Sequence, residues 1–122
     1  MAGPARSVLL LCRCAPYGDG RARDALDAAM AFAAFDQPVA LLLLGDAVLM
    51  LHAGQQDRPM QTRNLARLVA ALPDYGILRI AVEARALEER ALGADSLLLP
   101  VDALDNAQIA ALIAAHDVVL SL

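Results

Sequence analysis

The amino-acid sequence predicts an α/β fold: a single three-layer domain with a mainly parallel five-stranded sheet and helices on both faces. Two observations lead to this prediction. Apolar runs of strand length alternate along the chain with stretches of helical period, which is the order of consecutive β-α-β units. The chain has 122 residues and shows no internal repeat or linker, so we expect residues 1–122 to form one domain.

The first strand, the first helix and the second strand follow one another closely. Residues 7–14 are apolar on both faces for most of their length, which is typical of a strand in the middle of a sheet. Residues 21–35 repeat apolar positions at steps of three and four, which predicts a helix. Gln37 and Pro38 end that pattern, and residues 39–44 predict a second buried strand.

The centre of the chain predicts a polar loop followed by a helix. A short helical piece over residues 47–51 leads into residues 52–59, which are polar and without period, and we expect a mobile or partner-contacting loop there. Thr62 is the expected N-cap of the next helix. Residues 73–76 read Pro-Asp-Tyr-Gly and close that helix with turn residues.

The next segments predict a third and a fourth strand. Residues 78–82 alternate weakly and are expected as the third strand. Residues 85–92 predict a helix, and Gly93 is its expected left-handed C′ residue. Residues 97–101 form a short apolar run that predicts the fourth strand, and its proline favours an edge position or a strand end.

The end of the chain predicts one more helix and strand. Asp105 and Gln108 stand three residues apart and have the form of a capping box, which predicts the start of the last helix. Residues 117–122 are then expected as the fifth strand.

Composition and charge exclude several classes of function. The chain has 10 basic and 14 acidic residues and a net charge of −4, so we expect no direct contact with nucleic acid. The longest early apolar run, Val8–Cys12, is too short for a signal peptide or a membrane span, so a cytoplasmic protein without a structural disulfide is expected. The chain is 59% hydrophobic and only 3% aromatic, which leaves more apolar surface than so short a chain can hide. We therefore expect partner subunits.

Two cysteines are the first candidates for chemistry. Cys12 and Cys14 stand two apart on the first predicted strand, so their side chains share a face. Cys12 is expected to be a buried core thiol. Cys14 lies at the carboxyl end of its strand, where the following helix N-terminus would acidify its thiol into a nucleophile; whether Cys14 is reactive stays open. With His52 and His116 far away in the sequence, no metal site is expected.

The two histidines have a functional and a structural interpretation. His52 would serve as an acid or base in its polar loop, or is a surface histidine. His116 is expected to cap the last helix, because an imidazole near the final carbonyls is favourable there. Gly18 and Gly20 would let backbone N–H groups approach an anion, but Arg23 stands where the dinucleotide-binding fingerprint needs glycine, so no cofactor is expected.

Four charged residues near position 88 are expected to lie on a helix surface and not in a functional site. The helix predicted over residues 85–92 carries two glutamates and two arginines, which predicts a solvated helix face with local ion pairs. The residues concerned are Arg85, Glu88, Glu89 and Arg90.

Five segments in a fixed order carry a family resemblance. Residues 15–18 read Ala-Pro-Tyr-Gly and residues 23–28 read Arg-Asp-Ala-Leu-Asp-Ala; residues 45–48, 87–92 and 116–120 read Gly-Asp-Ala-Val, Leu-Glu-Glu-Arg-Ala-Leu and His-Asp-Val-Val-Leu. In their order and spacing these segments resemble the DsrE/DsrF-like sulfur-relay family, and within it the TusC/DsrF type of subunit. The matches extend over nearly the whole chain.

The resemblance implies a subunit of a heteromeric complex that passes persulfide sulfur between protein thiols. TusB-like and TusD-like sister subunits, or DsrH-like and DsrE-like ones, would be its partners in a heterohexamer, with a downstream sulfur-acceptor protein. The sulfur would travel toward 2-thiouridine at the tRNA wobble position, or take part in dissimilatory sulfur oxidation. The alternative outside sulfur relay is a small-ligand-binding regulatory module that shares only the fold.

In such complexes the resemblance places the sulfur-carrying cysteine on the DsrE/TusD subunit, just after the third strand. Glu83 occupies that place here, and a carboxylate cannot hold a persulfide. An accessory subunit without its own catalytic cysteine is therefore expected, and whether it has enzymatic activity through Cys14 stays open. Glu83 itself is expected as an interface or capping residue. The turn with Tyr17, Gly18 and Arg23 is expected to face the sister subunit's site.

Overall fold

The computed structural model describes residues 6–13, 15–16, 20–53, 60–77 and 79–122, and in residues 60–64 the backbone only. Its strands are β1 (Val8–Cys12), β2 (Val39–Leu43), β3 (Arg79–Glu83), β4 (Asp102–Leu104) and β5 (Val118–Ser121). Its helices are α1 (Arg21–Ala34), α2 (Met60–Ala71), α3 (Ala84–Glu89) and α4 (Asn106–Ala114). Short 3-10 turns form η1 (Gly45–Leu51), η3 (Leu72–Tyr75) and η4 (Ala94–Ser96).

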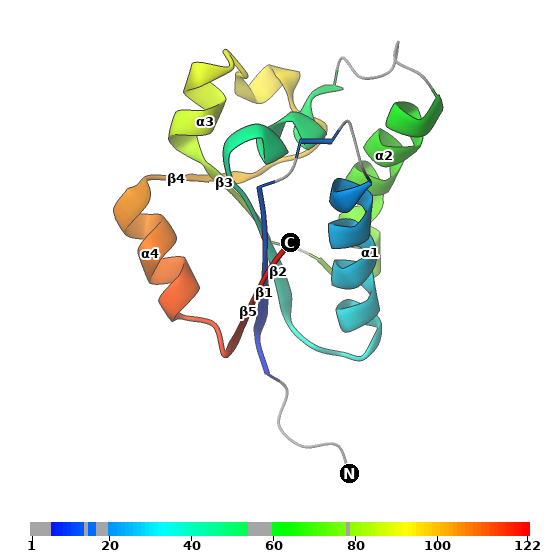
Figure 1. The fold of residues 1–122 in the computed structure, drawn as a ribbon, viewed down its shortest axis with the longest axis vertical. Coiled ribbons are helices and arrows are strands. Elements are labelled where there is room, and N and C mark those ends of the chain that lie inside the picture. The colour runs from blue at the N-terminus through cyan, green and yellow to red at the C-terminus, as the bar shows by residue number, and fades with distance from the viewer. Residues whose placement is uncertain (1–5, 14, 17–19, 54–59, 78) are drawn as a thin grey trace.

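The strands form one five-stranded sheet in the order β4-β3-β2-β1-β5, and every neighbouring pair is parallel. The predicted α/β fold with helices on both faces is confirmed (Figure 1). The first strand lies inside the sheet as expected, because β1 pairs with β2 on one side and β5 on the other, while β2 is the central strand. Both β1 and β2 are buried along their whole length, so apolar character marks an inner strand without specifying which one.

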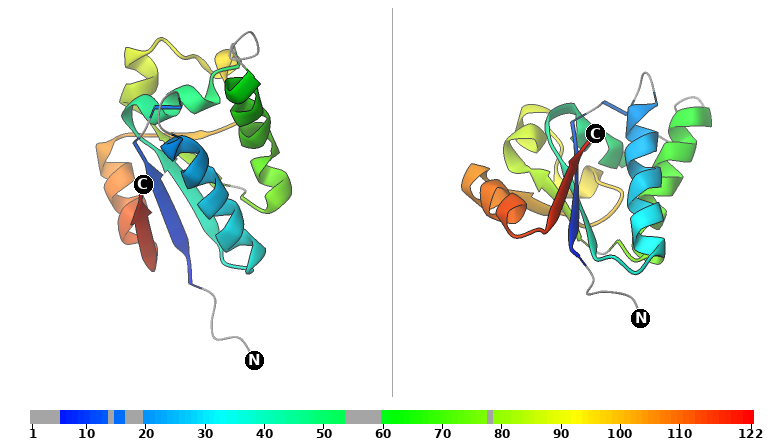
Figure 2. Two further views of the ribbon diagram at one scale, coloured as in Figure 1. Left: turned by 45° about the vertical axis from the view of Figure 1, so that its right-hand side comes forward. Right: turned by 60° about the horizontal axis from the view of Figure 1, so that its bottom comes forward.

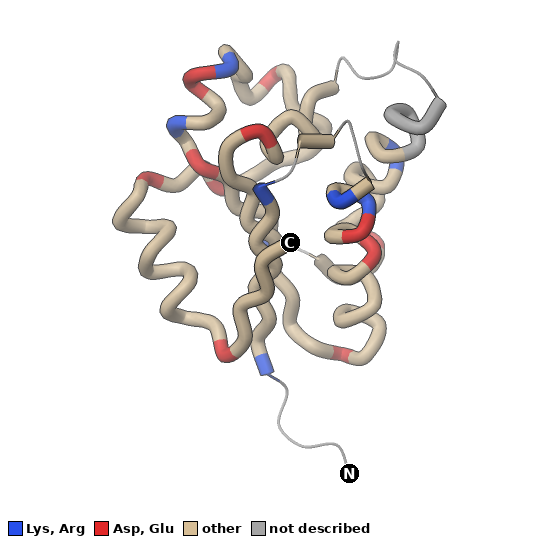
Figure 3. The backbone as a smooth tube through the Cα atoms, in the orientation of Figure 1, with Lys and Arg blue, Asp and Glu red and all other residues tan. Residues whose placement is uncertain are grey.

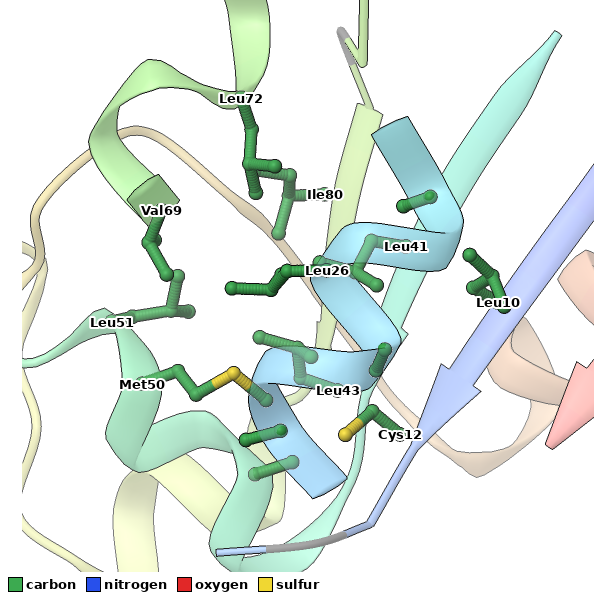
Figure 4. Close-up of a cluster of buried hydrophobic side chains, with 14 of the residues drawn as sticks. Leu10, Cys12, Leu26, Leu41, Leu43, Met50, Leu51, Val69, Leu72 and Ile80 are labelled. Atoms are coloured by element: carbon green, nitrogen blue, oxygen red, sulfur yellow. The ribbon is translucent and has the colours of Figure 1, made fainter. Parts of the chain in front are cut away.

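Helices α1 and α2 cover one face of the sheet and α4 covers the other, as the two views in Figure 2 show. Because side chains alternate along a strand, Leu10 faces the α1 side and Leu9 the α4 side. The core on the α1 side is the larger one, and Figure 4 shows part of it. The residues labelled there are Leu10, Cys12, Leu26, Leu41, Leu43, Met50, Leu51, Val69, Leu72 and Ile80.

The fourth strand differs from its prediction. Residues 97–101 are coil, half-buried except for the exposed Pro100 and with one antiparallel bridge between Leu97 and His52, and the strand follows at Asp102–Leu104. The Leu98 amide donates to the Leu51 carbonyl oxygen over 2.7 Å, so this apolar run packs against η1 without joining the sheet. Pro100 stands just before the edge strand β4, in keeping with the expected preference for an edge or a strand end.

Two helix boundaries also differ. Helix α2 begins at Met60, so Thr62 lies inside it and is not its N-cap. Helix α3 ends at Glu89, and the left-handed residue is Ala91 with φ 52°, whereas Gly93 has φ −84°. The Leu92 amide donates to Leu87 and the Ala91 amide to Glu88, the two hydrogen bonds of a Schellman motif, so alanine occupies the usual glycine position.

The capping box of the last helix is confirmed. The Gln108 amide donates to Asp105 Oδ1 over 2.8 Å, and the Asp105 amide donates to Gln108 Oε1 over 2.9 Å. The short helical piece before residue 52 is also present, as η1. Of the polar loop predicted over residues 52–59, residues 54–59 lie outside the described part of the chain.

Candidate functional site

The carboxyl ends of the parallel strands meet at one edge of the sheet, where open α/β folds place their sites. Strand β2 leads there into η1 at Gly45, and β3 leads into α3 at Glu83. Since β2 and β3 are neighbours, the two exits lie side by side, and α3 and η1 lie together above this edge in Figure 1. Glu83, at the end of the third strand, therefore lies at the edge where a site is expected.

Glu83 joins the two exits directly. Its side chain is half-buried, and the Gly45 amide donates a hydrogen bond to its Oε1 over 3.1 Å. Gly45 has φ +54°, a left-handed conformation that glycine adopts without the penalty of a Cβ, and this turns the chain out of β2. Glu83 stands at the N-cap position of α3 but its side chain makes no capping hydrogen bond. Its carboxylate therefore holds η1 and does not cap α3.

Arg90 makes a second connection at the other end of α3. Its Nη2 lies 2.6 Å from Asp46 Oδ1, and its Nη1 donates to the Ala86 carbonyl oxygen over 3.1 Å. The side chain is 23% exposed, so the expectation of a solvated residue is wrong for Arg90. It holds for the exposed pair of Arg85 and Glu89, whose Nε and Oε1 are 2.9 Å apart. Both ends of α3 are thus tied to the first two residues of η1.

Arg23 is not part of this arrangement. It is exposed on α1 and its Nε lies 3.3 Å from Asp27 Oδ1, one helical turn along. Within the described part of the chain, no hydrogen bond or ion pair joins Arg23 to Glu83. Cys14, Tyr17 and Gly18 lie outside the described residues.

Cys12 is a buried thiol in the core on the α1 side, as expected (Figure 4). Its exposed fraction is 0%, so a sulfur donor in solution cannot reach it. Among the residues that the structure describes, no group of three or more histidine, cysteine or acidic side chains could hold a metal ion.

The histidines serve the fold in the positions described. His116 Nδ1 lies 2.8 Å from the Leu112 carbonyl oxygen at the end of α4, which confirms its role as a helix cap. Its neighbour Asp117 accepts hydrogen bonds from the Ser7 amide over 2.9 Å and the Ser7 hydroxyl over 3.2 Å. These hydrogen bonds, the amide first, lower the pKa of Asp117 below its ordinary value, with Arg6 and His116 adding smaller favourable charges. His52 is half-buried beside Leu97.

The family model described as the DsrE/DsrF-like family matches residues 6–122. The chain belongs to the DsrE/DsrF-like family. Among similar proteins, a Protein TusC homolog of Pseudomonas aeruginosa is 38% identical over 117 residues, covering 96% of this chain and 98% of that one. A Protein TusC homolog of Vibrio vulnificus is 30% identical, covering 81% and 84%. The intracellular sulfur oxidation protein DsrF of Allochromatium vinosum is 38% identical, covering 76% and 68%.

The fold of this DsrE/DsrF-like chain also has a solved counterpart. The ychN protein of E. coli superposes with a TM-score of 0.78, covering 96% of this chain and 99% of that one at 18% identity. At that identity the similarity concerns the fold alone. No helix in the described residues combines the length and the apolar character needed to cross a bilayer.

Sequence reasoning missed Gly45, Asp46 and Arg90 as residues of the edge in this family member. A Gly-Asp pair after a buried strand indicates a turn, and that signal was available. Gly45 and Glu83 are 38 positions apart, and Asp46 and Arg90 are 44 positions apart. No local pattern connects such distant residues.

Proposed function

We propose that the chain is a non-carrier subunit of a heteromeric sulfur-relay complex of the TusBCD type, which passes persulfide sulfur toward 2-thiouridine at the tRNA wobble position. The observation that carries the proposal is Glu83. It ends β3 at the place where the carrier subunits of such complexes have a cysteine, and its carboxylate is engaged by the Gly45 amide. A carboxylate cannot form a persulfide.

Glu83 also disfavours a reactive thiol beside it. A carboxylate raises the pKa of a nearby thiol, because it disfavours a second negative charge. Cys12 is buried and inaccessible. The carrier thiol is therefore assigned to a sister subunit, and this chain acts as an accessory subunit that shapes the neighbouring site. Tyr17, Gly18, Arg23 and Glu83 are the residues that we assign to that contact.

The surface supports assembly with sister chains. Helix α4 exposes alanines where a solvated helix usually carries charges, namely Ala107, Ala110, Ala111 and Ala114. Beyond it, Val119 and Leu122 are 38% and 43% exposed. Exposed apolar area of this kind is typical of protein interfaces. TusB-like and TusD-like sister subunits and a downstream sulfur-acceptor protein are the proposed partners, in the cytoplasm and without direct contact to nucleic acid.

Coverage favours the TusC type over the DsrF type. Both kinds of relative reach 38% identity, but the match to the TusC homolog spans 98% of that protein and the match to DsrF spans 68%. A DsrF-type subunit in sulfur oxidation, with DsrH-like and DsrE-like partners, is the second candidate. The name of the Allochromatium relative supports it.

The test uses the chain co-expressed with its two sister subunits and supplied with a radiolabelled persulfide donor. We expect labelled sulfur on a sister chain and none on this one, and Cys14→Ser should transfer sulfur at the wild-type rate. Deleting the chain should abolish 2-thiouridine in hydrolysed tRNA. Unchanged 2-thiouridine together with lost sulfur oxidation would select the DsrF-type role. A stable added sulfur atom on this chain, with the sister chains unmodified, would contradict the proposal.

A further inference from the structure

The charge of the protein is unevenly distributed along the chain. Residues 79–122 hold seven of the 14 acidic residues and three of the 10 basic ones, so this part carries the whole net charge of −4. It comprises β3, α3, η4, β4, α4 and β5. Figure 3 shows these charges over α3, η4 and β4. In residues 84–104, which comprise α3, η4 and β4, four acidic residues stand against two arginines, so a partner that docks there meets more negative than positive side chains: Glu88, Glu89, Asp95 and Asp102 against Arg85 and Arg90.

An open apolar hollow lies on the same side, between α3 and the edge strand β4. Its floor is Leu87, which is buried, and the half-buried Leu92. Exposed Ala91 and Ala103 form its walls, so only small side chains stand between the floor and solvent. The hollow encloses about 360 Å³, enough for an aliphatic side chain. The hollow is lined by Ala84, Leu87, Glu88, Ala91, Leu92, Gly93 and Ala103.

The rim of the hollow is acidic, and the nearby arginines are already paired. Glu88 lines the hollow and is exposed. Arg85 pairs with Glu89 and Arg90 pairs with Asp46, and among the described residues the Glu88 side chain makes no hydrogen bond or ion pair. The Glu88 carboxylate therefore stands uncompensated beside an apolar floor.

We propose that this hollow is the docking site for an aliphatic side chain of a partner protein, flanked on the partner by arginine or lysine. Charge complementarity decides the occupant. The hollow of a second copy would bring two acidic rims together, and the phosphates of a nucleic acid would be repelled in the same way. The identity of the partner rests on the proposed function: the partner is a sister subunit of the sulfur-relay complex.

Two substitutions test the site through its two components. Ala103→Trp fills the hollow from an exposed position on β4, and Glu88→Arg reverses the charge of the rim. We expect each to weaken binding of the purified sister subunits by at least about tenfold, because apolar anchors and rim charges act together at interfaces. Raising the salt concentration should weaken the wild-type complex more than the Glu88→Arg complex.

Matched controls separate docking from folding. Ala31→Trp adds the same bulk at an exposed position of α1, and Asp74→Arg reverses an exposed charge on η3. Both should bind like the wild type. Thermal unfolding of each co-expressed variant shows whether it folds, and the charge reversal keeps the test valid if the tryptophan variant unfolds.

A photo-crosslinking residue in place of Ala103 identifies the occupant in the assembled complex. We expect crosslinks to a sister-chain peptide with an aliphatic residue next to arginine or lysine. Wild-type affinity in both test variants, or crosslinks to a second copy or to RNA, would overturn the inference while sulfur transfer through the complex leaves the proposed function intact. If the wild-type chain binds neither sister subunit, the proposed function fails instead.

Discussion

The hydrogen bond from the Gly45 amide to Glu83 predicts a measurable effect on local opening of η1. Glu83→Ala removes the acceptor and leaves the amide without its 3.1 Å partner. A hydrogen bond to a charged group contributes about 1.5–3 kcal/mol, and half-burial reduces this to about 1–1.4 kcal/mol. Amide exchange in the peptide that contains Gly45 should therefore become about five- to tenfold faster, since 1.4 kcal/mol is a factor of ten.

Hydrogen–deuterium exchange of the co-expressed complex, read by mass spectrometry, measures this effect. Glu83→Gln keeps an oxygen that accepts from the amide but loses the negative charge, so its exchange rate should lie between those of the wild type and Glu83→Ala. Glu88→Ala removes an exposed carboxylate from the same helix and should leave the Gly45 peptide unchanged. If Glu83→Ala exchanges at the wild-type rate, the carboxylate does not hold η1 and the reasoning is refuted.

Three further predictions follow from the contacts described. Asp46→Asn and Arg90→Met should show a coupling of about 0.5–1 kcal/mol in a double-mutant cycle by urea unfolding, the range of a partly exposed ion pair; additive effects would contradict it. Ala91→Gly should stabilise the chain by about 0.5 kcal/mol in the same assay, because relief of the left-handed strain exceeds the added freedom of glycine; a loss would contradict it. Asp117 has a lowered pKa in the folded state, so its stabilising effect is complete above its ordinary value of 3.8 and is lost as the pH falls through the folded value. The melting temperature of the wild type should therefore drop with acid more steeply than that of Asp117→Asn, and parallel curves would contradict this.

Local chemistry decided the elements that the sequence predicted correctly. The capping box at Asp105 needs only the side chain three residues on, and the buried strand β2 needs only a continuous apolar run. Two predictions were wrong for different reasons. Residues 97–101 are apolar enough for a strand, but their leucines and valine pack partly buried against the core beside η1, and hydrophobic burial does not require a place in the sheet. Ala91 takes the left-handed turn that its neighbour Gly93 was expected to make.

The location of the candidate site could be predicted from the sequence, but the contacts within it could not. The position of Glu83 follows from the alternation of strands and helices, because the end of any inner parallel strand lies at the same edge. Gly45 can be its partner because β2 and β3 are neighbours in the sheet, and strand order is a property of the whole fold. The contact of Arg90 with Asp46 also depends on which strands are neighbours. The sequence alone therefore predicted only ion pairs within the helix.

Helix α3 connects the edge of the sheet with the proposed docking hollow. A helix of six residues is too short to hold its place by its own hydrogen bonds, so its position depends on what it packs against and is tied to. Glu83 and Arg90 tie it to η1, and Leu87 and Glu88 line the hollow. A partner seated in the hollow thus contacts the same helix that Glu83 begins. Loosening η1 through Glu83→Ala should for this reason also weaken docking, although Glu83 does not line the hollow.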